Sequence, residues 1–368
     1  MTTIALAKPS LDGSELAAVQ AVLASGHLTQ GSVTECFERQ LASYLGLTEA
    51  VACTSATTAL HLAMVALNIG AGDEVVVPSF TFPATAHAVI QQGATPVFAD
   101  IDLDTFNLNA DSLQRCLNDR TRAVIPVHLF GMPANMAAIQ AIADHAGIAV
   151  VEDAACALGA VSQGRPCGAL GDLACFSFHP RKIITTGEGG MVTGRDTDLL
   201  HRIRRLRQHG GDRVNGRFDF KEPGFNYRMS DVNAALGTAQ LNRLDTLIAQ
   251  RRTLARHYDQ LLGRHCPQVR LPCAAEGDVH SYQAYVVLLP RQTDRDALIV
   301  RLRARGVETT LGTYALHAER YMQARYAYRN EQLPDAYTAY RHTLTLPLYP
   351  DMSTDTVAHV VSELARAL

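Results

Sequence analysis

Between residues 50 and 194, short apolar runs rich in β-branched residues alternate with segments of helical periodicity. Short apolar runs bounded by turn residues are typical of buried strands, whereas apolar residues recurring every three or four positions indicate helices. The pattern predicts strands at 50–55, 73–80, 95–101, 122–130, 148–155, 173–178 and 190–194. It predicts intervening helices at 57–69, 84–92 and 135–146. This alternation favours an α/β fold with a mostly parallel, helix-covered sheet.

The two ends of the chain add further elements. Residues 10–25 have the pattern of an amphipathic helix capped by Ser10 or Asp12. The pattern of residues 229–262 predicts one long helix or a pair of helices that lead out of the sheet domain. After about residue 265 the pattern changes to strand-like and helical segments that indicate a smaller α+β domain. We therefore expect a large domain over 1–245 and a small domain over 246–368.

Composition narrows the class of partner. The chain has 368 residues, 47% of them hydrophobic, and its 33 basic residues nearly balance 36 acidic ones. No strongly basic surface indicates nucleic acid or an anionic membrane, so a small-molecule partner is expected. The start of the chain lacks a leader pattern, and no apolar run approaches the roughly 18 residues of a membrane span, which favours a cytoplasmic protein. The eight cysteines form no CxxC pair, so we expect reduced, mostly structural thiols and no metal site.

The residues that follow the predicted strands carry the candidate chemistry, because open α/β sheets bind ligands at the carboxyl ends of their strands. One strand runs into "TSATT", which opens a helix whose free amides and dipole suit a phosphate. Simple capping by Ser55 or Thr54 is the alternative. The sequence contains neither GxxxxGK[ST] nor GxGxxG, so the usual nucleotide signatures are missing.

A carboxylate and an amine follow two other predicted strands. Asp153 follows a buried strand and could pair with a protonated ring nitrogen, or it could cap the next helix. Lys182 lies five residues beyond Ser177 in "FSFHPRKIITTGEGGMVTG", and lysine is the residue that forms Schiff bases, although a lone loop lysine is usually solvated. A phosphate site, a ring-nitrogen acid and a Schiff-base lysine together predict pyridoxal 5′-phosphate as the cofactor.

From about Pro9 to the C-terminus the sequence resembles the DegT/DnrJ/StrS sugar aminotransferases. The resemblance rests on "SGHLTQGSVTECFE", "VPSFTFPATAHAV", "IPVHLFGMPANM", "VEDAACALGA", "FSFHPRKIITTGEGGMVTG", "FNYRMSDVNAALGTAQL" and "LTLPLYPDMS", in this order. It implies the fold-type-I architecture of pyridoxal-phosphate enzymes, with a seven-stranded sheet in the large domain. It also implies a homodimer with shared active sites.

The resemblance assigns roles to individual residues. Lys182 would form the Schiff base with the cofactor, Asp153 would face the pyridine nitrogen, and Phe82 would stack on the ring. The phosphate would be held by four residues, the last of them from the other subunit: Ala56, Thr57, Ser177 and Asn226.

Two positions depart from the family pattern. Cys156 stands where the family usually has Gln or His near the ring hydroxyl of the cofactor, and either a weakly bonding thiol or a buried filler fits there. The segment "VETTLGTYALHAERYMQ" lacks the usual proline before its histidine. Four residues are candidates for the substrate pocket, with plain packing as the alternative: Tyr314, His317, and from the partner subunit Tyr227 and Arg228.

The resemblance implies transfer of an amino group, with L-glutamate as the expected donor, to a keto group of a nucleotide-linked sugar. A sugar dehydratase on the same scaffold is one alternative, but those members replace the lysine that is kept here as Lys182. An aminotransferase acting on a cyclitol ketone and a non-catalytic regulatory protein are others. The arginine-rich stretch at 201–213 is expected to be a solvated or interface helix without a site.

Overall fold

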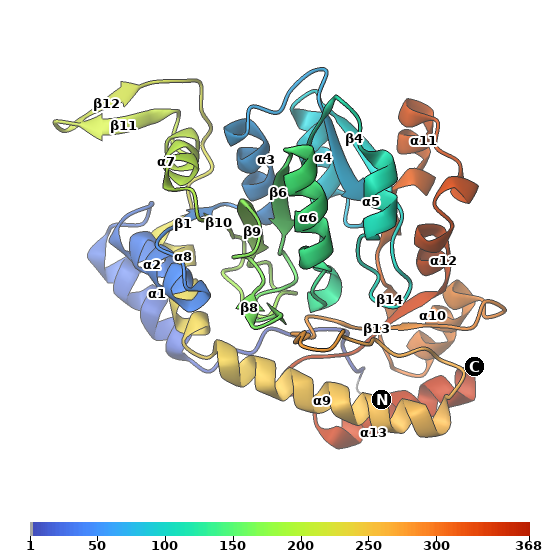
Figure 1. The fold of residues 1–368 in the computed structure, drawn as a ribbon. Coiled ribbons are helices and arrows are strands. Elements are labelled where there is room, and N and C mark those ends of the chain that lie inside the picture. The colour runs from blue at the N-terminus through green and yellow to red at the C-terminus, as the bar shows by residue number, and fades with distance from the viewer. Residues whose placement is uncertain (1–2) are drawn as a thin grey trace.

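The structure, a computed structural model, describes residues 3–368. Its centre is a seven-stranded sheet in the order β1-β10-β9-β6-β5-β2-β4 (Figure 1). The strands are β1 (Ala50–Cys53), β2 (Glu74–Pro78), β4 (Thr95–Ala99), β5 (Thr121–Val124), β6 (Ala149–Asp153), β9 (Leu173–Ser177) and β10 (Gly190–Gly194). Only β10 runs antiparallel to its neighbours. The predicted seven-stranded, mostly parallel sheet is confirmed.

Helices cover both faces of this sheet. One face packs on α3 (Ala56–Ala66), α4 (Ala84–Gln91) and α7 (Thr197–Leu206). The other packs on α2 (Ser32–Leu45), α5 (Ala110–Cys116), α6 (Met136–Ala146) and α8 (Asp231–Leu241). Successive side chains alternate between the faces, so Val75 and Val77 join one core cluster and Val76 the opposite one. Burial on both faces explains why the strands read as continuous apolar runs.

The C-terminal part adds a second core around α9 (Leu244–His265). That core also contains α10 (Arg295–Ala304), α13 (Thr354–Ala367) and an antiparallel sheet in the order β13-β16-β14, made of Tyr285–Leu288, Thr343–Leu346 and Thr310–Leu311. The helix α9 crosses the boundary expected after residue 245, because Leu247 packs in the large-domain core and Leu262 in the C-terminal one. Ile4 pairs with Val307, so the start of the chain also joins this second core.

The segment 314–342 returns to the large domain. It contains β15 (Tyr314–Ala315), α11 (Arg320–Tyr326) and α12 (Pro334–His342), and it packs into the core beneath α3 and α4 through Leu316 and Met322. The strand β15 pairs with β3 (Phe80–Thr81), just beyond β2. A small hairpin of β7 (Val161–Ser162) and β8 (Arg165–Pro166) follows β6. The C-terminal part of the chain therefore reaches the sheet edge where β2 ends.

Two local predictions need correction. The helix α1 (Ser14–Ser25) begins after Gly13, so neither Ser10 nor Asp12 is its N-cap residue; the Asp12 carboxylate instead accepts the amide of Ser14. Gly13 occupies that position with φ 95°, a left-handed conformation that favours glycine. Of the two alternatives for the arginine-rich stretch, a solvated or an interface helix, the solvated one is wrong at its end, because Arg207 is only 1% exposed.

The arginines of α7 and the residue after it tie the helix to its neighbours. Arg207 binds the Glu38 carboxylate and the Ala52 carbonyl, and Arg204 also pairs with Glu38. The side chain of Arg202 pairs with Glu222. Buried arginine requires such partners because its charge cannot be removed near neutral pH. The positive run is therefore neutralised within the chain.

Beyond α7, the strands β11 (Gly211–Val214) and β12 (Arg217–Phe220) form a hairpin that extends away from the body (Figure 1). Its Phe218 and Phe220 rings are stacked at 5.7 Å and are 41% and 64% exposed. Among the helices of residues 3–368, none combines the length and apolar character that a bilayer crossing needs.

The segment that links the C-terminal core to the large domain contains a buried histidine. His280 is 5% exposed, and its Nδ1 accepts the amide of Tyr282 at 2.9 Å. Burial lowers the pKa of His280 to about 3. The imidazole therefore stays neutral in the folded protein, whereas in the unfolded chain it takes up a proton near pH 6.5.

This difference predicts a pH-dependent stability. The contribution of neutral His280 to the free energy of unfolding is fully present above about pH 6.5. It is lost as the pH falls toward 3, because the unfolded chain then binds a proton that the folded chain does not. In urea titrations, wild type should lose about 2 kcal/mol more stability between pH 7 and pH 5 than His280→Asn, whose amide oxygen can replace Nδ1 as the acceptor. Equal losses in the two proteins would contradict this account.

Candidate active site

The carboxyl ends of the central strands meet at one edge of the sheet. Cys53 of β1 and Ser177 of β9 both pair with Gly190, the first residue of β10. Asp153 of β6 pairs with Cys175 on the adjacent strand β9. The strand ends that the sequence singled out therefore lie side by side, within a few strand spacings of about 4.8 Å.

The start of α3 is prepared as an anion site. The Ser55 hydroxyl accepts the amide of Thr58 at 3.1 Å, and the Thr58 hydroxyl accepts the amide of Ser55 at 3.0 Å. Capping by Ser55 is thus confirmed. This capping box gives the amide of Thr58, the third residue of the helix, a hydrogen-bond acceptor. The amides of the first two helical residues, Ala56 and Thr57, have no acceptor within the helix. Both the cap and a bound phosphate fit this helix start.

Gly190 is a residue of this site that the sequence reasoning missed. A Cβ atom on Gly190 would lie 2.3 Å from the Ser55 carbonyl carbon and 2.7 Å from the Ala56 nitrogen. Only glycine therefore lets β10 pass so close to the start of α3. The glycine-rich run "GEGG" before the strand is the signal that could have identified it.

Asp153 is a buried carboxylate without a paired cation. It is 5% exposed, and it accepts hydrogen bonds from the Thr85 hydroxyl at 2.7 Å and the Ala155 amide at 3.2 Å. No basic side chain within residues 3–368 forms an ion pair with it. Burial raises the pKa of Asp153 above its usual value. No helix begins directly after it, so the capping alternative fails, and a protonated ring nitrogen fits this carboxylate.

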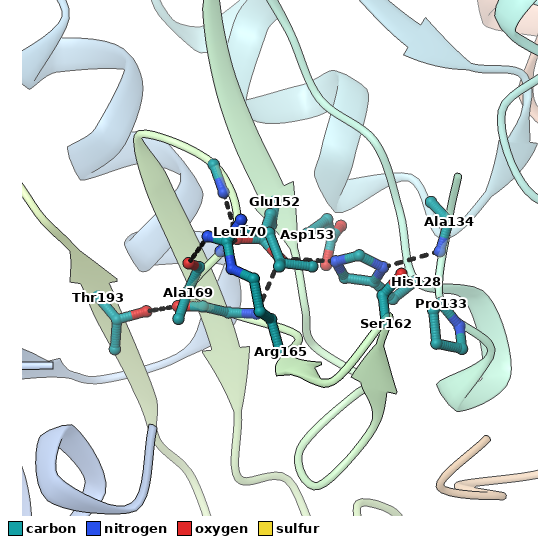
Figure 2. A network of polar contacts seen from close by, with 12 residues as sticks. His128, Pro133, Ala134, Glu152, Asp153, Ser162, Arg165, Ala169, Leu170 and Thr193 are labelled. Carbon is teal, nitrogen blue, oxygen red and sulfur yellow. Dashed lines mark hydrogen bonds and ion pairs between the residues drawn. The ribbon is translucent and has the colours of Figure 1, made fainter. Parts of the chain in front are cut away.

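The neighbouring Glu152 has the opposite role. Its side chain points to the other face, where the His128 imidazole donates from Nε2 at 2.8 Å and the amide of Ala134 donates to Nδ1 at 3.0 Å (Figure 2). The Glu152 carboxylate also accepts hydrogen bonds from three backbone amides at no more than 2.8 Å: those of Gly168, Leu170 and Gly171. Burial raises the pKa of Glu152, but the bonds from His128 and these amides outweigh it and hold the pKa low. Glu152 thus anchors the backbone on which Asp153 sits.

Lys182 lies in the loop after β9 and is half-buried, not solvated. Its Nζ donates to the Sγ of Cys156 at 3.1 Å, and Cys156 lies in the turn that follows Asp153. The backbone amide of Lys182 donates to the His179 carbonyl at 2.8 Å, which fixes the loop. The amine, the thiol and the buried carboxylate are therefore brought to the same end of the sheet.

The side chain of Phe82 is 63% exposed at the end of β3, as a residue that stacks on a ligand ring needs to be. Tyr314 pairs with Thr81 across the β15–β3 ladder and is 38% exposed. The environment of His317 fits the packing alternative. It is fully buried, its Nδ1 lies 2.5 Å from the Ser79 hydroxyl, and burial lowers its pKa to about 4. It joins the C-terminal segment to the strand before Phe82.

The segment "FNYR" follows the projecting hairpin. Tyr227 stacks on Phe225 at 4.9 Å, and its hydroxyl lies 3.2 Å from Nδ1 of His61 on α3. Asn226 is exposed, and none of the residues the structure describes forms a hydrogen bond with its side chain. Arg228 is half-buried.

The close approach of Gly190 yields a prediction. The Cβ of Gly190→Ala would displace the start of α3, so the affinity for pyridoxal phosphate should fall at least about tenfold, or about 1.4 kcal/mol. Gly263 in α9 has no atom within 4 Å of the position that a Cβ would occupy, so Gly263→Ala is the matched control. Equilibrium titration with the cofactor measures both. Unchanged affinity in Gly190→Ala would separate this helix start from phosphate binding.

Comparison with known proteins agrees with this geometry. The DegT/DnrJ/EryC1/StrS aminotransferase family matches the chain over residues 9–365. GDP-perosamine synthase of Caulobacter vibrioides is 40% identical over 369 residues, which span 99% of this chain and 98% of that protein.

Solved structures share the whole fold. The aminotransferase TlmJ from Streptoalloteichus hindustanus matches with a TM-score of 0.93 and 38% identity, over 99% of this chain and 98% of that one. Spr1654 from Streptococcus pneumoniae, in its PLP form, matches with a TM-score of 0.95 and 27% identity, over 99% and 98% of the two chains. These matches confirm the resemblance seen in the sequence: the chain belongs to the DegT/DnrJ/EryC1/StrS aminotransferase family.

Proposed function

We propose that this protein is a pyridoxal-phosphate-dependent aminotransferase that moves an amino group from L-glutamate to a keto group of a nucleotide-linked sugar. The observation that carries the proposal is that a half-buried Lys182 amine and a buried Asp153 carboxylate without an ion pair lie at the same sheet edge. The relative named GDP-perosamine synthase supports a nucleotide-linked substrate, and the PLP form of Spr1654 supports the cofactor.

The residues at the sheet edge fit the parts of this cofactor. Asp153 would hold the protonated ring nitrogen, and Phe82 would cover one face of the ring. The phosphate would bind at three residues around Gly190: Ala56, Thr57 and Ser177. When bound, pyridoxal phosphate supplies an electron sink and carries the amino group between donor and acceptor.

Lys182 has two tasks in this proposal. Its Nζ would hold the cofactor covalently between turnovers, and the same atom, once free, would take a proton from the α-carbon of the amino donor and later return one. The negative charge of Asp153 would keep the ring nitrogen protonated and so strengthen the withdrawal of electrons that the cofactor supplies. A positioned base of this kind contributes about 10²- to 10⁴-fold in rate.

A second copy of the chain would complete the site. Asn226 follows the projecting hairpin in the chain and is exposed, so it is free to reach the phosphate of a partner subunit. Tyr314 of one subunit, with Tyr227 and Arg228 of the other, would line the substrate pocket. For His317, whose buried ring contacts Ser79, we infer a role in positioning the segment that precedes Phe82.

The reaction is tested by following nitrogen from isotopically labelled glutamate into a panel of nucleotide-linked keto sugars by mass spectrometry. We expect label in at least one amino sugar and an equal yield of 2-oxoglutarate. Label entering only cyclitol ketones, or no transfer with any acceptor, would contradict the proposed substrate class.

The role of Lys182 predicts that Lys182→Ala abolishes steady-state transamination while far-ultraviolet circular dichroism stays unchanged. Arg181→Ala is the matched control, because Arg181 is exposed in the same loop and forms hydrogen bonds only through its backbone, with Gln283 and His179. We expect the control to retain turnover. Sustained turnover in Lys182→Ala would remove this residue from the mechanism.

Asp153→Asn removes the charge with little change in volume. We expect weaker retention of the cofactor during gel filtration and a loss of about 10³-fold in turnover, or about 4 kcal/mol at the barrier. Thermal unfolding of the cofactor-free protein should change little, since the Ala155 amide can still donate to the Asn oxygen and the Asn NH2 group can donate to the Thr85 hydroxyl in its place. A near-native rate in Asp153→Asn would show that no ring-nitrogen pair is needed.

A further inference from the structure

The Lys182 amine lies against a thiol. The distance from Nζ to the Sγ of Cys156 is 3.1 Å. This separation falls within the roughly 3–3.5 Å from which two atoms can react without rearrangement of the chain. The family usually has Gln or His at this position, whereas this chain places an oxidisable sulfur beside the amine.

Both backbones that carry these side chains are fixed. Cys156 lies in a turn that two hydrogen bonds hold in place. The Ala155 amide donates to the Asp153 carboxylate, and the Ala157 amide donates to the Ala154 carbonyl at 2.9 Å. The loop of Lys182 is held by its own amide on the His179 carbonyl. The two side chains therefore stay within reach of each other.

The surroundings favour this pair over the other cysteines. Cys156 is half-buried, so a small oxidant can reach it. All eight cysteines are free, and four are fully buried: Cys53, Cys167, Cys175 and Cys266. An oxidised cysteine is usually resolved by a second thiol or by a nitrogen nucleophile. At Cys156 the group within contact distance is the nitrogen of Lys182.

We propose that Cys156 is an oxidative modification site at which hydrogen peroxide closes a sulfur–nitrogen bond to Lys182. In the first step the thiol takes one oxygen from the peroxide, giving a sulfenic acid and water. In the second step the neutral Lys182 amine attacks sulfur, a second water leaves, and an S–N bond replaces one S–O and one N–H bond. The peroxide is reduced by two electrons and the sulfur is oxidised by two.

The consequence for activity rests on the proposed function. A Lys182 nitrogen bonded to sulfur cannot hold the cofactor, so the bridged enzyme is inactive. Two equivalents of an added thiol reductant break the S–N bond and regenerate both side chains. Bound pyridoxal phosphate occupies the same nitrogen and protects it, so the bridge forms in protein that lacks cofactor.

The test exposes the full chain, with and without excess pyridoxal phosphate, to hydrogen peroxide, then blocks free thiols and digests without reductant. Mass spectrometry should find the Cys156 and Lys182 peptides joined, lighter than their sum by two hydrogen atoms. The joined species should replace most of the free Cys156 peptide without cofactor, decrease with it, and disappear on adding dithiothreitol.

Two variants give the controls. Cys273→Ser removes the exposed thiol and should leave the joined species unchanged, whereas Lys182→Arg should yield only acids of sulfur at Cys156.

Cys156 found as sulfinic acid beside a free Lys182 in wild type would overturn the proposal. Because the bridge is read in protein without cofactor, this result is independent of whether the chain transaminates. Bridge formation that pyridoxal phosphate does not reduce would keep the modification and count against the proposed role of Lys182.

Discussion

The site depends on one costly arrangement, the burial of the Asp153 carboxylate without an ion pair. Thr85 and Ala155 supply two hydrogen bonds, which do not neutralise the charge. An isolated buried carboxylate is unfavourable unless it is paired. The adjacent Glu152 shows the contrast, since His128 and three backbone amides satisfy it completely. Glu152 therefore stabilises the fold, whereas Asp153 stays available to a positively charged ring.

The sheet register brings the remaining parts to Asp153. Because Gly190 pairs with both Cys53 and Ser177, the reversed strand β10 draws the start of α3 toward the end of β9. The loop after β9 then returns Lys182 to the turn that follows β6. The C-terminal segment supports the opposite side, where β15 pairs with β3 ahead of Phe82. Binding groups from distant parts of the sequence are thus placed by rigid strands.

Much of this architecture could be predicted from the sequence. All seven sheet strands have apolar runs, because strands buried on both faces need them; Asp153 ends one such run, and Lys182 lies five residues beyond Ser177, where another strand ends. The environments of Arg207, His317 and Gly190 could not be predicted, because each depends on a contact with a distant segment: Glu38, Ser79 and Ser55. The predicted start of α1 is wrong because a left-handed Gly13, and not a polar side chain, precedes the helix.

The most direct test of the central claim is the near-visible absorbance of the purified protein with pyridoxal phosphate, before and after excess L-glutamate. We expect a yellow band from the cofactor joined to Lys182, which glutamate converts to the colourless amino form of the cofactor. A folded protein that forms no such band with added cofactor, or whose band glutamate and other amino donors leave unchanged, would contradict it.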